Sequence, residues 1–238
     1  MKNNTYKFIH ILTLLFSVYM VCLGLFVDFH PKWYMSLWEK LIIYATPMVV
    51  LFLDMKLNMR RITDEEEKCR LQHKTLRRIF VIYVISLATL LFLGSTFRRG
   101  IWYRNIWKVE PFSKDLITYY CNLDILKSTK MYYRAAVHHT MSLKIIILNL
   151  VGNLIAFAPF GFFLPVLFKK KIKNVFIFTI VIVLSSGLGE FIQFITMVGQ
   201  ADIDDVILNV LGALIIYSIV HIPVMRKGIR KMLPYGEF

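Results

Sequence analysis

Charged residues are scarce in this chain, and acidic ones are the scarcest. Only 18% of its 238 residues are charged, while 57% are hydrophobic. A soluble domain keeps roughly a quarter of its residues charged to cover its surface, whereas a surface that faces lipid can be apolar. The composition therefore excludes an ordinary soluble domain and favours an integral membrane protein.

Cysteines are also few, and their placement gives no pairing. Cys22 lies in an apolar run, and Cys69 and Cys121 are expected on opposite sides of the membrane, so no disulfide is predicted. No spacing of Cys and His resembles a zinc site. The net charge of +14 could suggest nucleic acid, but the basic residues cluster between apolar runs, where helices meet anionic lipid. Nucleic-acid binding is therefore not expected.

Apolar runs long enough to cross a bilayer core, which takes about 20 residues, occur along most of the chain. They cover Lys7–Val27, Leu37–Leu53, Ile79–Phe97, Ile145–Phe168, Val175–Val198 and Val206–Met225. The second is the weakest, because it is short and contains Pro47. The predicted fold is all-α, a polytopic transmembrane helix bundle of about six spans.

The distribution of Lys and Arg predicts the orientation. The Asp54–Arg78 loop holds eight, the Lys169–Asn174 turn four and the tail after Met225 four, whereas the Gly199–Asp205 turn holds none. Positive loops stay inside, so both termini are expected in the cytoplasm. Three regions result: three spans with a charged cytoplasmic loop (1–97), an outer loop (98–144) and a core of three spans with a cytoplasmic tail (145–238).

The outer loop is rich in aromatic residues that alternate with Arg and Lys. They include Trp102, Tyr103, Trp107, Phe112, Tyr119, Tyr120, Tyr132 and Tyr133. Aromatic rings with one polar edge favour the headgroup level, so short interfacial helices are predicted here. A small extracellular cap packed on itself is the alternative.

Outside the weakest span, Leu37–Leu53, Glu190 is the only acidic residue within the predicted spans, and a carboxylate there usually faces the bundle interior or water. At about 1.5 Å per residue, Glu190 and Asn153 lie roughly 12 Å, and Asn209 roughly 9 Å, below the outer ends of their spans. These three side chains are therefore expected at one level. The residues predicted to line a polar pocket open to the outer face are Asn149, Asn153, Glu190, Gln193, Asp202, Asp204, Asp205 and Asn209.

Carboxylates gathered at one mouth repel unless cations or protons compensate. Arg98, Arg99 and Arg104 are the nearest candidates, and a divalent cation on Glu190, Asp204 and Asp205 is another. Ser185, Ser186, Gly187 and Gly189 would let helices approach closely beside Glu190. Pro159, Gly161 and Pro165 predict a helix break near the bilayer centre.

Three segments together resemble the VanZ-like family of bacterial membrane proteins. They are Asn149–Pro165 (NLVGNLIAFAPFGFFLP), Ser185–Gln193 (SSGLGEFIQ) and Asp202–Gly212 (DIDDVILNVLG), with a weaker match at Pro111-Phe112. Members often carry Arg before the DIDD element, where this chain has Gln200-Ala201, and Asn where it has Lys108. The resemblance implies a bacterial plasma-membrane location and a link to teicoplanin-type glycopeptide resistance.

The leading functional hypothesis is a cell-envelope protein that lowers glycopeptide action by binding or handling a lipid-linked ligand in the outer pocket. The expected partners are membrane lipid and a lipid-linked cell-wall intermediate, and the oligomeric state is left open. One alternative is an ion- or proton-coupled lipid flippase. Another is a metal-assisted enzyme acting on a lipid phosphate. No nucleophile–base pair is apparent, so binding is favoured over catalysis.

Overall fold

The computed structural model describes residues 2–30, 33, 35–93, 117, 120–196 and 198–235. Within these residues, six helices are long and apolar enough to cross a membrane. They are Lys7–Phe29, Leu37–Met59, Glu65–Leu93, Leu143–Leu167, Val175–Thr196 and Ile203–His221. The prediction of an all-α polytopic bundle with six spans is therefore confirmed. Two compact units divide the chain near residue 100.

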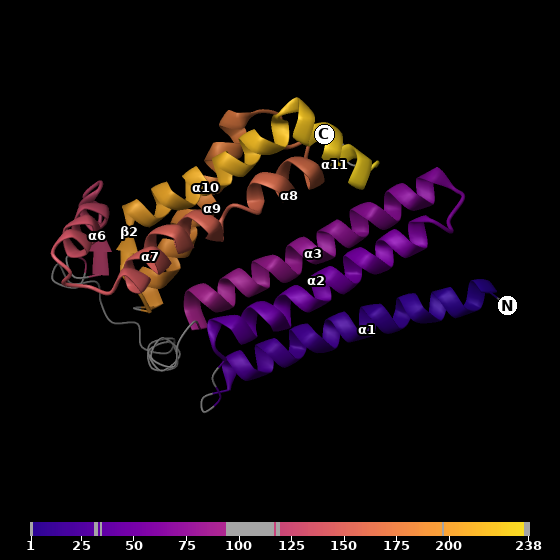
Figure 1. Ribbon diagram of the computed structural model, residues 1–238, viewed down its shortest axis with the longest axis horizontal. Helices are drawn as coiled ribbons and strands as arrows, with labels where there is room; N and C mark the ends of the chain where they lie inside the picture. The colour runs from indigo at the N-terminus through magenta and orange to yellow at the C-terminus, as the bar shows by residue number, and fades with distance from the viewer. Residues whose placement is uncertain are drawn as a thin grey trace. The chain divides into compact units, whose positions relative to one another are not determined.

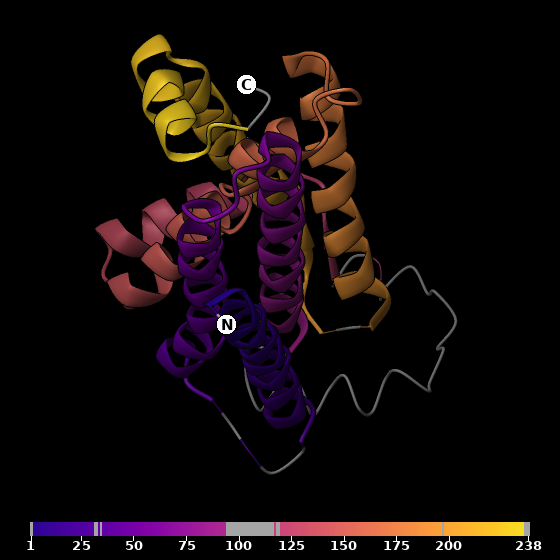
Figure 2. The same ribbon diagram turned by 90° about the vertical axis from the view of Figure 1, so that its right-hand side faces the viewer.

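Unit 1 contains α1 (Lys2–Phe29), α2 (Leu37–Met59) and α3 (Glu65–Leu93). These helices run side by side, with α2 packed against both others (Figure 1, Figure 2). The start of α2 is a capping box, in which the Ser36 amide donates to Glu39 Oε2 over 2.7 Å and the Glu39 amide donates to Ser36 Oγ over 3.3 Å. Pro47 is buried within α2 without ending it, so the weakest predicted span is a continuous helix of 23 residues.

Two acidic residues that the predicted span limits exclude lie inside the helices of unit 1. Asp28 ends α1 and pairs with Lys40 of α2, and each is only 2% exposed. Asp54 lies in α2, where His10 Nδ1 is 2.5 Å from its Oδ2. Glu190 is therefore not the only acidic residue within the spans. The limits were too short because an ion pair with a neighbouring helix lets a carboxylate stay at membrane depth.

Unit 2 is built around α10 (Ile203–His221), which packs against α7 (Leu143–Ala156), α8 (Phe160–Leu167) and α9 (Val175–Thr196). Two glycines set these close approaches. A Cβ on Gly212 would lie 1.7 Å from the Leu154 carbonyl oxygen, and one on Gly161 would lie 2.3 Å from that of Ala213. A close approach of this kind requires residues without a side chain.

The fourth and sixth predicted spans are each interrupted. Residues 157–159 form a turn between α7 and α8, Pro159 caps α8, and Pro165 lies within it. The sixth span, predicted to run to Met225, ends at His221, and α11 (Pro223–Met232) follows. Proline at residue 223 has no N–H to continue the α10 ladder.

The outer connection contributes a short helix and a strand to unit 2. The helix is α6 (Lys127–Val137), and the strand is β1 (Cys121–Asn122), which pairs in parallel with β2 (Ala201–Asp202). Arg98, Arg99, Arg104 and the aromatic residues from Trp102 to Phe112 lie outside the described residues. The three cysteines are free.

Candidate functional site

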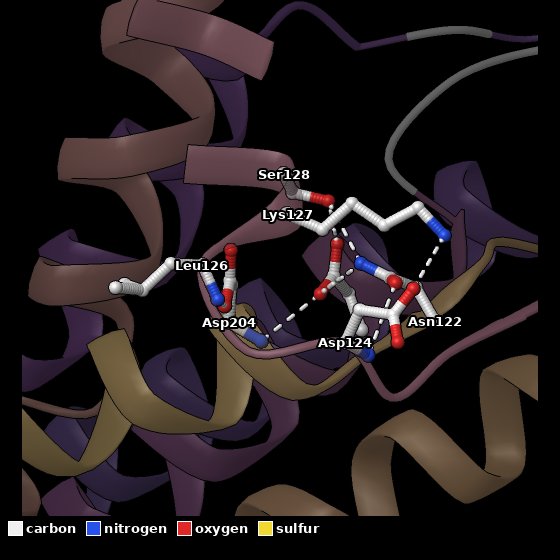
Figure 3. Close-up of polar contacts among 7 residues, drawn as sticks. Asn122, Asp124, Leu126, Lys127, Ser128 and Asp204 are labelled. Carbon is white, nitrogen blue, oxygen red and sulfur yellow. Dashed lines mark hydrogen bonds and ion pairs between the residues drawn. The ribbon is translucent and has the colours of Figure 1, made fainter. Parts of the chain in front are cut away.

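The pairing of β1 with β2 brings a segment of the outer connection onto the turn between α9 and α10. Its register places Asn122 opposite Asp202. Asn122 Nδ2 donates to Asp202 Oδ1 over 3.1 Å and to Ser128 Oγ over 3.2 Å, and the Ser128 hydroxyl donates to Asp202 Oδ2 (Figure 3). Asn122 is 4% exposed and Asp202 is 8% exposed, so these groups meet away from solvent.

Asp204 holds the start of α6. Its Oδ1 accepts from the Leu126 amide over 2.6 Å (Figure 3), and its Oδ2 accepts from the Thr129 amide over 2.9 Å. The first amides of a helix have no partner inside the helix, and its dipole favours a negative charge there. Asp204 thus caps a helix that precedes it by more than 70 residues in the chain.

The Leu126 backbone is left-handed, with φ 62° and ψ 14°. This conformation costs a residue with a side chain roughly 1–2 kcal/mol. It directs the Leu126 amide toward Asp204, and the two amide bonds to that carboxylate hold the strained position. The carboxylate and the loop conformation therefore depend on each other.

Glu190 of α9 forms a hydrogen bond with the backbone at the beginning of α10. Its Oε2 accepts from the Asp202 amide over 3.1 Å, and Glu190 is 9% exposed. Asp202 is the N-cap of α10, and its Oδ1 accepts from the Asp204 amide over 2.9 Å. Glu190, Asp202 and Asp204 are therefore linked in series from α9 to α6.

Deeper in the bundle, Asn209 of α10 donates from Nδ2 to Ser186 Oγ of α9 over 2.8 Å. Asn209 is 4% exposed and Ser186 is 1% exposed. Within the described part of the chain, Asn209 Oδ1 is buried and has no hydrogen-bond partner. A buried acceptor without a donor is unfavourable by about 1–3 kcal/mol, so it indicates either strain or a missing partner.

The predicted common level of the polar groups is not what the structure shows. Asn209 meets Ser186, which is four residues, or about 6 Å, further into α9 than Glu190. The reason is that the chain after α9 folds back: the Val198 amide donates to the Gln193 carbonyl over 3.2 Å, before β2 reaches Glu190. As a result, α10 begins level with Glu190.

The two asparagines of α7 differ from the expected arrangement. Asn149 donates to the Ile145 carbonyl of its own helix over 2.8 Å. Asn153 is half-buried and precedes Leu154, which contacts Gly212, so it lies deeper than Asn209. Neither prediction for these residues as pocket groups is tested by these contacts.

The small residues of α9 were expected to let a neighbouring helix approach closely, but no neighbouring helix among the described residues lies close to Gly187. A Cβ there would have nothing within 4 Å. The close contacts of unit 2 instead involve Gly161 and Gly212. Gln193 is buried, and the turn at Gly199 lies next to its side chain. A Cβ built on Gly199 would be 3.5 Å from Gln193 Cδ.

Tyr132 of α6 lies within electrostatic range of the Asp205 and Asp202 carboxylates. Burial raises the pKa of Tyr132 above that of an exposed tyrosine, and the carboxylates of Asp205 and Asp202 raise this pKa further. A phenol that stays protonated beside carboxylates can donate a hydrogen bond. Tyr132 and Asp205 therefore form the part of the site nearest to α6.

Neutral groups donate to two of the acidic side chains. Within the described part of the chain, Asp202 and Asp204 accept from backbone amides, the Asn122 amide group and the Ser128 hydroxyl. Among the residues that the structure describes, no three His, Cys, Asp or Glu side chains converge as metal ligands. The hypothesis of a divalent cation on Glu190, Asp204 and Asp205 stays a prediction.

The backbone freed by the helix break is largely used within its own turn. The amides of Ala158, Phe160 and Gly161 donate to the carbonyls of Ile155, Phe157 and Ala158 over 2.9–3.1 Å. Such i to i−3 bonds satisfy carbonyls that could otherwise bind a ligand. The break thus shapes the bundle around α10 and offers few free acceptors.

Sequence reasoning did not find Asn122, Ser128 or Tyr132 as site residues. One local signal was present: the Asp124 amide donates to Asn122 Oδ1 over 3.3 Å, an Asx turn that the Asn-x-Asp spacing permits. The pairing of β1 with β2 was not readable, because each strand has only two residues. The polar cluster is the name used below for the set Asn122, Ser128, Tyr132, Ser186, Glu190, Asp202, Asp204, Asp205 and Asn209.

The fold and the polar cluster define a multi-pass membrane protein in which acidic residues at a helix–helix turn hold an extramembrane segment. The family model of VanZ/LLP1 matches residues 80–225, which include the three segments that resemble VanZ-like proteins. The chain belongs to this family. Comparison with curated proteins and with solved structures gives no match.

Proposed function

We propose that this VanZ-like protein lowers the susceptibility of its bacterium to teicoplanin-type glycopeptides by binding a lipid-linked cell-wall ligand at the polar cluster. The main support for this proposal is that Asn209 Oδ1 is a buried acceptor without a hydrogen-bond partner among the described residues. A ligand hydroxyl or amide would supply the missing donor. Sites that hydrogen-bond a ligand donor are selective, because the acceptor stays unpaired without it.

The arrangement around Asn209 favours binding over catalysis. Asp202 and Asp204 are engaged in holding β1 and the start of α6. Glu190 supports the α9–α10 turn through the Asp202 amide. Fixed groups of this kind preorganise a site and lower the entropy cost of binding.

The proposed location is the outer face of a bacterial plasma membrane. The α9–α10 turn has no basic residue, whereas Lys169, Lys170, Lys171 and Lys173 lie in the α8–α9 turn at the opposite end of α9. The positive-inside rule then places the polar cluster outside, where a glycopeptide acts, and both termini in the cytoplasm.

The test is a susceptibility measurement in a teicoplanin-sensitive bacterium that expresses the protein from a plasmid. Wild type is expected to raise the minimal inhibitory concentration, and Glu190→Gln and Asp205→Asn to return it toward the empty-plasmid value. Asp124→Asn is the matched control, because the Asp124 carboxylate is exposed and pairs only over 2.9 Å with exposed Lys127. An undiminished effect of both cluster variants at equal membrane abundance would overturn the proposal.

A further inference from the structure

Unit 1 holds two adjoining cavities of opposite character, and no residue of the polar cluster lines either of them. One, of about 520 Å³, is mainly apolar, and the other, of about 760 Å³, is strongly basic. Volumes of this size are typical of ligand sites, roughly 300–1,000 Å³. Arg78 lines both cavities, so the two adjoin at this residue.

The apolar cavity lies between α1 and α3. Its principal lining residues are Leu14, Val18, Val21, Val81, Ile82 and Ile85. Both helices pack on α2 and contact each other much less, which leaves a groove between them. Val18 is 61% exposed and Val81 is 55% exposed, so the groove opens sideways to where lipid chains would be.

The basic cavity lies at the end of unit 1 where α1 starts and where α2 connects to α3 (Figure 1). Its charged lining residues are Lys7, Arg61, Arg70, Lys74 and Arg78, against one acid, Glu67. Among the described residues, Lys7, Lys74 and Arg78 have no ion-pair partner. Three uncompensated cations in one cavity favour an anion.

His10 also lines the wall of the basic cavity. Asp54, the acid nearest to it, is already engaged by His10 and by Asn58 Nδ2, which donates over 2.9 Å to Asp54 Oδ1. This carboxylate therefore does not serve the cations of the cavity. Arg70 is bonded only weakly, 3.6 Å from an exposed Glu66.

We infer that these two cavities form one binding site for an anionic membrane lipid, with the phosphate headgroup in the basic cavity and an acyl chain in the apolar groove. Arg78 stands at the junction, where a planar guanidinium can bind phosphate oxygens in a bidentate manner. A free phosphate would account for the basic cavity alone. The apolar groove that adjoins it at Arg78 favours the lipid.

The experiment uses the full chain purified in a neutral detergent. Dihexanoyl phosphatidylglycerol is titrated while apparent affinity is followed by native mass spectrometry and by the rise in melting temperature. Dihexanoyl phosphatidylcholine, which has the same chains, and glycerol 3-phosphate, which has none, are the comparison ligands. The inference expects a clear preference for phosphatidylglycerol over both.

Two variants test the two halves of the site. Lys74→Gln with Arg78→Gln is expected to weaken phosphatidylglycerol binding about tenfold or more, from the loss of two cations. Val81→Trp, at a position exposed enough to tolerate the change, is expected to weaken it by filling the groove. Lys170→Gln with Lys171→Gln removes the same charge from the exposed α8–α9 turn and should leave binding unchanged.

Three results would overturn the inference. They are equal binding of the two phospholipids, equal loss in the two double variants, or binding of glycerol 3-phosphate as tight as that of phosphatidylglycerol. Melting and gel filtration without lipid show whether each variant is folded, and Arg78→Lys, which keeps the charge but loses the bidentate geometry, should retain more of the binding than the Lys74→Gln, Arg78→Gln double variant. None of these outcomes depends on glycopeptide susceptibility.

Discussion

The side chain of Asn122 donates a hydrogen bond to the carboxylate of Asp202, although 80 residues separate them in the chain. This contact joins the outer connection to the turn that begins α10. Asp204, which accepts two amide hydrogen bonds at the start of α6, makes a second such link. The acidic segment Asp202–Asp205 of this chain therefore acts as a clamp, in that it holds β1 and α6 against the start of α10. Among the described residues, the groups that remain for a ligand then lie around Asn209 and Tyr132.

Asp204→Asn should loosen α6 without unfolding the bundle. The change replaces a carboxylate that accepts two amide hydrogen bonds with an amide group that can accept only through one oxygen. Hydrogen bonds to charged groups contribute about 1.5–3 kcal/mol, so exchange of the α6 amides should be about tenfold faster or more. Hydrogen exchange with mass spectrometry of peptides covering 120–137 measures this. Unaltered exchange would contradict the clamp, and Asp124→Asn serves as the control.

Gly212→Ala should destabilise unit 2 strongly, because its Cβ would lie 1.7 Å from the Leu154 carbonyl oxygen. Overpacking typically costs about 1–3 kcal/mol, and contact with backbone places this variant at the upper end or beyond. Gly187→Ala is the matched control in α9, where a Cβ meets nothing within 4 Å. It should be neutral or stabilising by up to about 1 kcal/mol. Thermal unfolding in detergent compares the two, and equal melting temperatures would refute the close packing.

Lys40→Met should destabilise unit 1 by about 3–5 kcal/mol, because it leaves the buried Asp28 carboxylate without its cation. Tyr44, whose hydroxyl donates to Asp28 Oδ2 over 3.0 Å, cannot replace a charge. Combining Lys40→Met with Asp28→Asn should recover much of the loss. A double variant no more stable than Lys40→Met alone would show that the pair is not coupled.

Asp205→Asn should lower the pKa of Tyr132, because it removes one of the carboxylates that raise it. Burial still keeps this pKa above the ordinary value of about 10. The folded pKa exceeds the unfolded one, so the stabilisation from neutral Tyr132 is present below about pH 10 and is lost as pH rises through the folded pKa. Carbon-13 labelling of tyrosine Cζ, with Tyr132→Phe for assignment, follows the titration by NMR. An unchanged pKa would separate Tyr132 from Asp205.

Much of the fold was predictable from the sequence, because six long apolar runs have few alternatives to transmembrane helices. The limits of the spans were less accurate where a charge is neutralised by another helix, as for Asp28 and Lys40. The acidic element could be singled out from the sequence, but the contacts of its side chains could not be predicted. Asn122 and Ser128 reach it through a two-residue strand pair, and local sequence carries almost no signal for such long-range pairing.

The depth of Asn209 illustrates the same limit. Counting residues from the ends of the spans assumes that neighbouring helices begin at one level. Residues 198–202 fold back along α9, so α10 begins about as deep as Glu190. Asn209 therefore meets Ser186, and only the structure shows that its Oδ1 lacks a donor among the described residues.

We expect Asn209 to contribute more to ligand binding than to the stability of the fold. The most direct measurement is the teicoplanin inhibitory concentration of cells that express Asn209→Leu or Asn149→Leu, at matched membrane abundance and with melting temperatures of the purified proteins. Asn149 bonds only to the Ile145 carbonyl of its own helix over 2.8 Å, which makes it the matched control. We expect Asn209→Leu to melt no lower than wild type yet to give no more protection than the empty plasmid, while Asn149→Leu protects fully. Full protection by Asn209→Leu, or equal loss in both variants, would contradict it.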